Sequence, residues 1–147
     1  MNDWHYTPEW CEEDLLSGEY SGFVYMFTFT NSDEVYYGSK QLYKRVKEAK
    51  KIKDNSVENG WREYSSSSKS VNEKIENGEP YVKTILYAFP TMRETLLVES
   101  IIITTQILKS NCLNMAVMNK IRSPNAAMKK RLLDIVQELL TYLDWVK

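Results

Sequence analysis

Residues 22–40 read Gly22-Phe23-Val24-Tyr25-Met26-Phe27-Thr28-Phe29-Thr30, then Asn31-Ser32-Asp33, then Glu34-Val35-Tyr36-Tyr37-Gly38-Ser39-Lys40. β-Branched and aromatic residues fill the two outer runs and turn-forming residues fill the middle, which predicts a β-hairpin. Side chains alternate along a strand, so the first run has two different faces. One face holds Phe23, Tyr25, Phe27 and Phe29, and the other holds Val24, Met26 and Thr28. Taken alone, this pattern is typical of cross-strand packing in a core.

The composition indicates one globular domain. The chain has 147 residues, of which 43% are hydrophobic and 27% are charged, so it can form a core without disulfides or a structural metal. It contains no apolar run of about 20 residues and no signal-peptide pattern, so we expect no membrane span and a cytoplasmic location. Cys11 and Cys112 favour two free thiols, and the single histidine, His5, argues against a zinc cluster.

Charge is unevenly distributed along the chain, although the net charge is −1. Residues 1–21 carry six acidic groups and no Lys or Arg, whereas residues 44–53 carry six basic groups and one acid, Glu48. This segregation creates a local positive field. A solvated helix face is the common reason for such a basic run, and contact with phosphates is the more specific one.

The segment after the hairpin is expected to alternate between helix and loop. Residues 41–53 have a helix-forming composition, and residues 54–70 form a polar loop that contains four consecutive serines. A short helix should follow over residues 70–76, with Ser70 as its N-cap.

The second half of the chain predicts one more strand and two helices. Residues 81–89 form the strand, and Thr91 caps a strongly apolar helix that runs through Ile107. A terminal helix begins with Pro124 at its first position. Together, the elements predict an α/β (α+β) domain with a small three-stranded antiparallel sheet flanked by helices and an extra C-terminal helix.

Short motifs in the chain resemble those of the GIY-YIG endonuclease family. Phe23-Val24-Tyr25 and Tyr36-Tyr37-Gly38 are similar to the two signature tripeptides. The family then places an arginine, a helical glutamate and an asparagine in this order, and Arg45, Glu99 and Asn114 match them. The segment Tyr64-Ser65-Ser66-Ser67-Ser68 resembles a Tyr-x-Gly-Ser-Ser segment of phage-type members. The chain departs from many members in lacking a histidine shortly after Arg45.

The resemblance implies a Mg²⁺- or Mn²⁺-dependent endonuclease that hydrolyses phosphodiester bonds of double-stranded DNA. Glu99 would bind the metal, and Tyr25 would orient or deprotonate the attacking water. Tyr36 would hold the water or the scissile phosphate, and Arg45 would bind a phosphate oxygen. Lys40 would share the role of Arg45 or lower the pKa of a tyrosine, and Asn114 would brace the site. The resemblance also implies that the protein is encoded by a phage and acts in the host cytoplasm. Its role would be that of a homing enzyme or of an enzyme that degrades DNA.

The expected organisation has three parts: an acidic arm at residues 1–21, a GIY-YIG-like nuclease domain at residues 22–119, and a C-terminal helix at residues 120–147 packed on the same domain. The residues expected to contact DNA are Lys44, Lys47, Lys50, Lys51, Lys53, Trp61, Arg62 and Tyr64. Packing over the core is the alternative role for Trp61. The terminal helix leaves open whether the protein is a monomer or a homodimer.

Two other functions are compatible with the same residues. A catalytically inactive module could keep the fold and bind DNA without cutting it. A phage protein-interaction factor could use the acidic arm and the last helix as its binding surface, and it would show no salt-dependent affinity for DNA.

Overall fold

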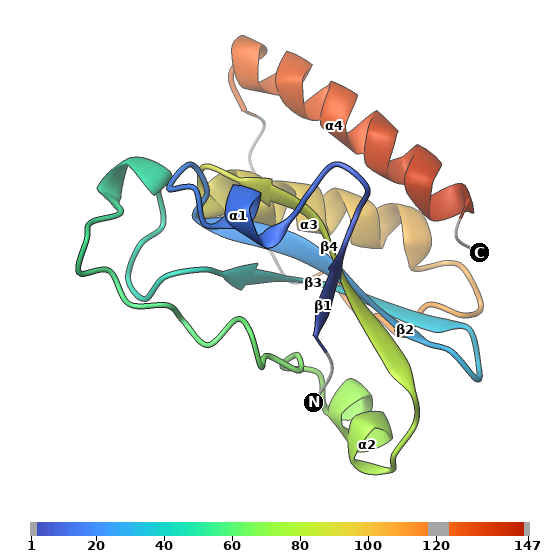
Figure 1. The fold of residues 1–147 in the computed structure, drawn as a ribbon. Helices are drawn as coiled ribbons and strands as arrows, with labels where there is room; N and C mark the ends of the chain where they lie inside the picture. The colour runs from blue at the N-terminus through green and yellow to red at the C-terminus, as the bar shows by residue number, and fades with distance from the viewer. Residues whose placement is uncertain (1–2, 118–123, 146–147) are drawn as a thin grey trace.

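The computed structural model describes residues 3–117 and 124–145. A mixed four-stranded sheet lies at its centre, in the spatial order β1-β4-β2-β3 (Figure 1). The strands are β1 (Trp4–Tyr6), β2 (Gly22–Phe29), β3 (Glu34–Gln41) and β4 (Tyr81–Phe89). The helices are α1 (Glu12–Leu15), α2 (Lys69–Glu76), α3 (Met92–Gln106) and α4 (Ala126–Trp145), with a short 3-10 helix η1 (Ala49–Lys51). In the described ranges, no helix has the length and apolarity needed to cross a bilayer.

The predicted hairpin is confirmed. Strands β2 and β3 pair in an antiparallel register that places Tyr25 opposite Gly38 and Tyr36 opposite Phe27. Asp33 closes the turn with a φ of 60°, a left-handed conformation that aspartate tolerates better than most residues. The alternation along β2 therefore sends its two sets of side chains into two separate cores.

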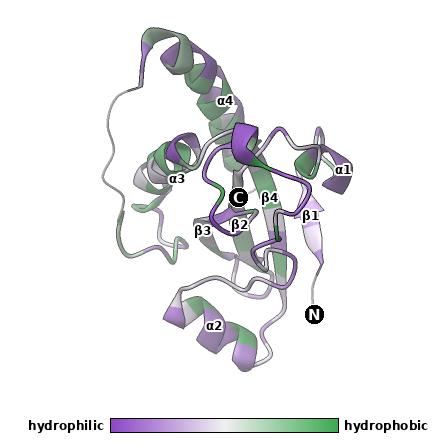
Figure 2. Ribbon diagram, turned by 90° about the vertical axis from the view of Figure 1, so that its left-hand side faces the viewer, coloured by the Kyte–Doolittle hydropathy of each residue, from purple (hydrophilic) through white to green (hydrophobic). Residues whose placement is uncertain are grey.

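Helices α3 and α4 cover one face of the sheet, and α2 lies on the other side (Figure 1). On the α3–α4 face, Val24 and Met26 of β2 pack against apolar side chains of both helices. In Figure 2, β4 carries apolar colour, α3 and α4 have both apolar and hydrophilic stretches, and β1 is pale to hydrophilic. The opposite face buries the four aromatic residues of β2 together with Leu15, Leu42, Trp61 and Val71.

The prediction of a three-stranded antiparallel sheet is wrong, because the N-terminal segment adds a fourth strand. Strand β1 pairs in parallel with β4, in a register that places Trp4 opposite Lys83. The Trp4 indole N–H donates a hydrogen bond of 2.7 Å to the carbonyl of Trp61, and its ring lies edge-on to Phe23 at 5.3 Å. Three residues are too few to show an alternation of polar and apolar side chains, so this strand could not be predicted from the residue pattern.

The helix predicted over residues 41–53 is also absent. β3 continues to Gln41, and between Leu42 and Lys53 the helical structure is the single turn η1. The backbone of this segment bonds to distant chain instead: the Lys44 N–H donates to the Val57 carbonyl at 2.8 Å, and the Ala49 N–H donates to the Pro90 carbonyl at 2.7 Å. Helix propensity is a weak preference, and these long-range bonds override it.

Two of the predicted caps move by a few residues. Ser68, not Ser70, caps α2, because its hydroxyl accepts the N–H of Val71. Helix α4 begins at Ala126 rather than at Pro124, and the Asn125 side chain accepts the N–H of Met128 at 2.9 Å.

The strand at residues 81–89 and the helix capped by Thr91 are confirmed, with α3 ending at Gln106. The apolar side chains of Leu132, Val136, Leu139 and Leu143 on α4 are buried against α3 and the sheet.

Trp4→Ala should lower the free energy of unfolding by about 2–3 kcal/mol, because it removes a large ring from the aromatic core and a hydrogen bond to the Trp61 loop. His5→Ala is the matched control, since His5 is exposed on the same strand and should change the stability by less than about 0.5 kcal/mol. Urea denaturation measures both variants. Equal stabilities would show that β1 is a loosely attached arm.

Candidate active site

Three tyrosines and a serine form the centre of the site. Tyr25 on β2 and Tyr36 on β3 lie on the aromatic face of the sheet, and Tyr64 reaches them from the loop before α2. The rings of Tyr25 and Tyr64 are 5.8 Å apart and meet edge to face. The Ser66 hydroxyl lies close enough to Tyr25 and Tyr36 to lower the pKa of both phenols.

Gly38, the glycine of the second tripeptide, makes room for Tyr25. A Cβ placed on Gly38 would lie 2.3 Å from the Tyr25 hydroxyl oxygen, far inside van der Waals contact. The two tripeptides therefore depend on each other: the tyrosine of one occupies the space that the glycine of the other leaves.

Burial controls the titration of both strand tyrosines. Tyr25 is only 1% exposed, and burial raises its pKa far above the usual value, while the Ser66 hydroxyl lowers it. Burial also raises the pKa of the half-buried Tyr36, and the Glu99 carboxylate raises it further. A phenolate is thus disfavoured at neutral pH, so Tyr25 is suited to orient its neighbours and not to act as a base.

Glu99 approaches the site from α3. Its effect on the pKa of Tyr36 shows that the carboxylate and the phenol are close enough to interact. Glu99 is half-buried, and the fully buried acid of α3 is Glu94, which is 2% exposed. Glu94 forms an ion pair with Arg131 of α4 and accepts the Thr91 hydroxyl at 2.8 Å. Glu94 is therefore the acid that is buried and ion-paired, whereas Glu99 is only partly buried.

Asn114 fastens the edge of the sheet next to Tyr36. Its side-chain oxygen accepts the N–H of Tyr37 at 2.9 Å, and its side-chain NH₂ donates to the carbonyl of Tyr37 at 2.8 Å. Leu113 extends this contact by donating its N–H to the Val35 carbonyl at 2.7 Å. The side chain is buried, and it fixes the backbone on the C-terminal side of Tyr36.

Lys40 lies beside Tyr64, and Arg45 is in the irregular segment that follows β3. The Lys40 ammonium is 4.4 Å from the centre of the Tyr64 ring, and burial lowers its pKa. Arg45 is exposed, with a φ of 64°, in the irregular segment after β3. Tyr36 is near the start of β3, about 17 Å from Gln41 at the strand's end, so Arg45 follows the far end of the strand.

The residues predicted to contact DNA fall into two groups. The five lysines are exposed, although Lys50 and Lys51 lie 3.6 and 3.2 Å from Glu48 carboxylate oxygens. The aromatic loop is engaged with the protein: Trp61 is 1% exposed in the core, so its ring is not available to stack on bases. Arg62 is paired with Glu12 at 2.7 Å and Glu58 at 3.0 Å.

Lys83 and Ser66 were missed by the reasoning from sequence. The Lys83 ammonium is buried and donates to the carbonyls of Arg62 and Tyr64 at 2.9 and 3.1 Å, which ties the loop to β4. The sequence feature that could have identified Lys83 is its place at a core-facing position of the strand, between Tyr81 and Ile85. Ser66 has a φ of 82° and occupies the glycine position of the Tyr-x-Gly-Ser-Ser resemblance, so a left-handed residue is required there.

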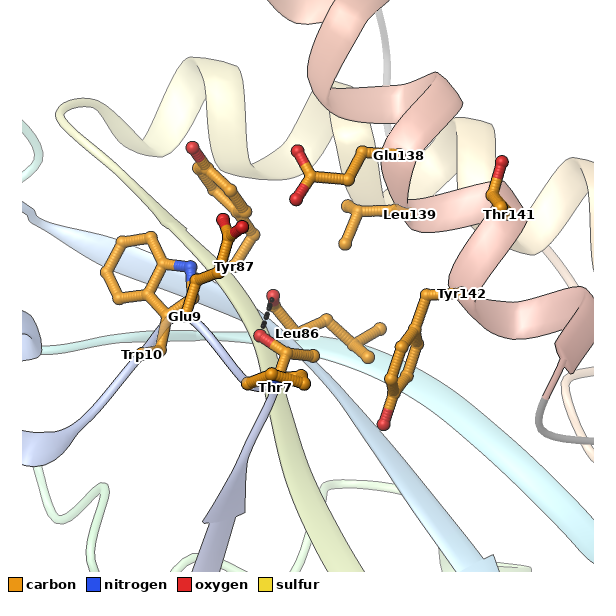
Figure 3. A pocket seen from close by; sticks show the side chains of 10 residues that line it. Thr7, Glu9, Trp10, Leu86, Tyr87, Glu138, Leu139, Thr141 and Tyr142 are labelled. Atoms are coloured by element: carbon orange, nitrogen blue, oxygen red, sulfur yellow. Dashed lines mark hydrogen bonds between the residues drawn. The ribbon is translucent and has the colours of Figure 1, made fainter.

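Two cavities border the sheet. One of about 530 Å³ is lined by Tyr36 and Asn114 and by the segment at the start of α2. The other, of about 250 Å³, lies between the segment after β1 and α4, where the Thr7 hydroxyl donates to the Leu86 carbonyl (Figure 3). None of the predicted site residues lines this second cavity, so the first is the one that belongs to the site.

The donor set fits Mg²⁺ better than a transition metal. In residues 3–117 and 124–145, no group of three or more His, Cys, Asp or Glu side chains could hold an ion. Mg²⁺ needs only one or two carboxylates, because it keeps several waters and takes further oxygens from a substrate phosphate. Glu99, beside Tyr36 at an accessible position, meets this requirement.

The buried phenols predict loss of stability in alkali. Burial raises the pKa of Tyr6 to about 12 and raises those of Tyr20, Tyr25, Tyr36, Tyr37, Tyr43, Tyr87 and Tyr142. Because these folded-state values exceed the unfolded value of about 10, their contribution is complete below about pH 10 and is lost above it.

Tyr25 alone should remove about 1.4 kcal/mol for each pH unit above about 10. Lys40 and Lys83, whose pKa values burial lowers, act in the opposite direction but are fewer. Thermal unfolding followed at increasing pH, with tyrosinate absorbance as the second signal, measures the effect. A melting temperature that stays constant through this range would contradict it.

Comparison with known proteins identifies a family. The family model described as "Putative endonuclease segE, GIY-YIG domain" matches residues 4–121. The match covers all four strands and α3, and it includes every residue placed in the site. Neither the curated proteins nor the solved structures contain a match.

Proposed function

The chain belongs to the segE GIY-YIG domain family, and from this premise we propose that it hydrolyses phosphodiester bonds of double-stranded DNA with Mg²⁺ or Mn²⁺. One arrangement supports the proposal: Tyr36 lies in the same cluster as Tyr25 and lines the cavity, and the charge of Glu99, from the distant helix α3, raises the pKa of the Tyr36 phenol. An acid whose charge perturbs a phenol beside a cavity is a candidate functional group.

Glu99 is the residue that would hold the ion, together with a DNA phosphate oxygen and water. A divalent ion there would offset the charge that develops on the phosphate and make a bound water more acidic. Tyr36, half-buried and in contact with the cavity, orients the water or the scissile phosphate through its hydroxyl. Tyr25 is sealed from solvent, so it acts through Ser66 and holds Tyr36 in place.

The cations around the site divide the work on the phosphates. Lys40 is near Tyr64 and is the candidate for the phosphate under attack. Arg45 joins Lys44, Lys47 and Lys53 as exposed groups that position the DNA backbone without reading bases. The placement of Arg45 after the far end of β3 is the reason for moving it from the catalytic set to the binding set.

The domain division follows the same pattern. The family match begins at residue 4, and β1 is a strand of the central sheet, so we extend the nuclease domain to include the N-terminal segment. The terminal helix packs on α3 and completes the core on that face, as expected for a single unit.

Nicking of a supercoiled plasmid tests the proposal. We expect conversion to the open circular form with Mg²⁺ or Mn²⁺, no conversion with EDTA, and a strong loss of rate in Tyr36→Phe, which removes only the hydroxyl. Equal nicking by the wild type and by a Tyr36→Phe, Glu99→Gln double variant would reveal a contaminating nuclease and overturn the assignment.

The displacement of Arg45 favours one alternative, a DNA-binding module without turnover. Such a protein would bind DNA with salt-dependent affinity and leave plasmid intact with either metal. A protein-interaction factor would show no salt-dependent binding to DNA at all.

A further inference from the structure

The cavity beside Tyr36 has two chemically different walls. One wall is the serine-rich segment that leads into α2, with Ser67, Ser68, Lys69 and Ser70. The other wall is the segment that follows Asn114, with Met115 and Ala116. The cavity of about 530 Å³ therefore has hydroxyls, the Lys69 ammonium and the Glu73 carboxylate on the α2 side, and Leu113, Met115 and Ala116 on the other.

Lys69 is available for an anion. It is exposed, and no ion pair of Lys69 occurs within the part of the chain that the structure describes. The neighbouring Lys74 of the same helix differs, since it is held by Glu34 at 2.7 Å and Glu79 at 3.6 Å. The Ser68 and Ser70 hydroxyls lie 3.1 Å from each other at the mouth of the cavity and add hydrogen-bonding capacity.

The opposite wall offers apolar contact. Met115 is 91% exposed, an unusual position for a large apolar side chain directly after the buried Asn114. A flexible thioether is well suited to lie against a sugar or the face of a base. Phosphate on one side and an apolar ring on the other is the profile of a nucleotide.

We propose that this cavity holds the nucleotide next to the scissile phosphate, with Lys69 contacting its phosphate and Met115 contacting its sugar or base. The inference rests on the proposed function, because Tyr36 connects the cavity to the reacting phosphate. The basic segment at residues 44–53 follows the opposite end of β3. The DNA strand thus passes across Tyr36 with protein contacts on both sides of the cut.

Lys69→Ala tests the phosphate contact. We expect the Kd for a duplex to rise roughly fivefold and the slope of log affinity against log salt to fall by about one, the change for one lost phosphate contact. With sub-saturating enzyme, the cleavage rate should fall in proportion to the loss of affinity, since the change affects binding. Lys130→Ala is the matched control: it removes the same charge from an exposed position on α4 and should change neither quantity.

Met115→Ala tests the apolar contact, and it should weaken binding without changing the salt slope. Measuring affinity in the Glu99→Gln background keeps the DNA intact and separates this inference from the function. If wild type cuts DNA but Lys69→Ala and Met115→Ala bind as tightly as it does, the cavity proposal is wrong and the nuclease proposal stands. If binding depends on Lys69 but no condition gives cleavage, the cavity binds a DNA nucleotide and the nuclease proposal is wrong. Absence of DNA binding overturns both.

Discussion

Glu99→Gln should lower the rate of Mg²⁺-dependent DNA cleavage by roughly 10³-fold, the loss typical of removing a main source of charge stabilisation from a transition state. The amide keeps the size of the side chain but loses the negative charge that a hard cation requires. Glu99 is half-buried on α3, so the variant should fold normally. Single-turnover cleavage of a labelled duplex measures the rate, and affinity for the same duplex should be unchanged or higher.

The same substitution has a second readout that does not depend on activity. Because the Glu99 carboxylate raises the pKa of Tyr36, its neutralisation should lower that pKa, which a tyrosinate titration detects. Glu76→Gln is the matched control, since it makes the same chemical change at an exposed position on α2. Full cleavage activity in Glu99→Gln, with or without the titration change, would remove Glu99 from the reaction.

Two substitutions at Ser66 should separate its hydroxyl from its backbone. Ser66→Ala and Ser66→Gly both lose the hydroxyl that lowers the pKa of Tyr25 and Tyr36, so both should cut DNA about 10²-fold more slowly, as expected when reacting groups shift by about 1 Å. Their stabilities should differ. The φ of 82° is strained for alanine and relaxed for glycine, so the glycine variant should be more stable by about 1 kcal/mol.

The glycine variant therefore decides what Ser66 does. A residue that only shapes the loop would be replaced by glycine at no cost in activity, because glycine meets the backbone requirement best. A residue that positions the phenols would leave a stable and nearly inactive protein. Thermal melts and cleavage rates of the two variants give the answer, and wild-type cleavage by Ser66→Gly would reduce Ser66 to a loop residue.

Elements with a local signal were predictable from the sequence. The hairpin, the strand at residues 81–89 and the helix capped by Thr91 each combine a periodic apolar pattern with a turn or cap residue. The family could be identified from the sequence for the same reason, because its tripeptides lie on the two strands of the hairpin. The segment at residues 41–53 has no such agreement: its composition favours a helix, and its backbone bonds to Val57 and Pro90 prevent one.

The amino-acid sequence by itself determined the family, the hairpin and the order of the chemical groups, because these depend on residue type and on spacing along one strand or helix. Only the tertiary structure decided which groups meet. It brought Glu99, Tyr64 and Ser66 to the two strand tyrosines, took Trp61 into the core and left Arg45 beyond the end of β3. Contacts between distant segments set burial and local dielectric, and these determine whether a phenol is a base, a hydrogen-bond partner or part of a core.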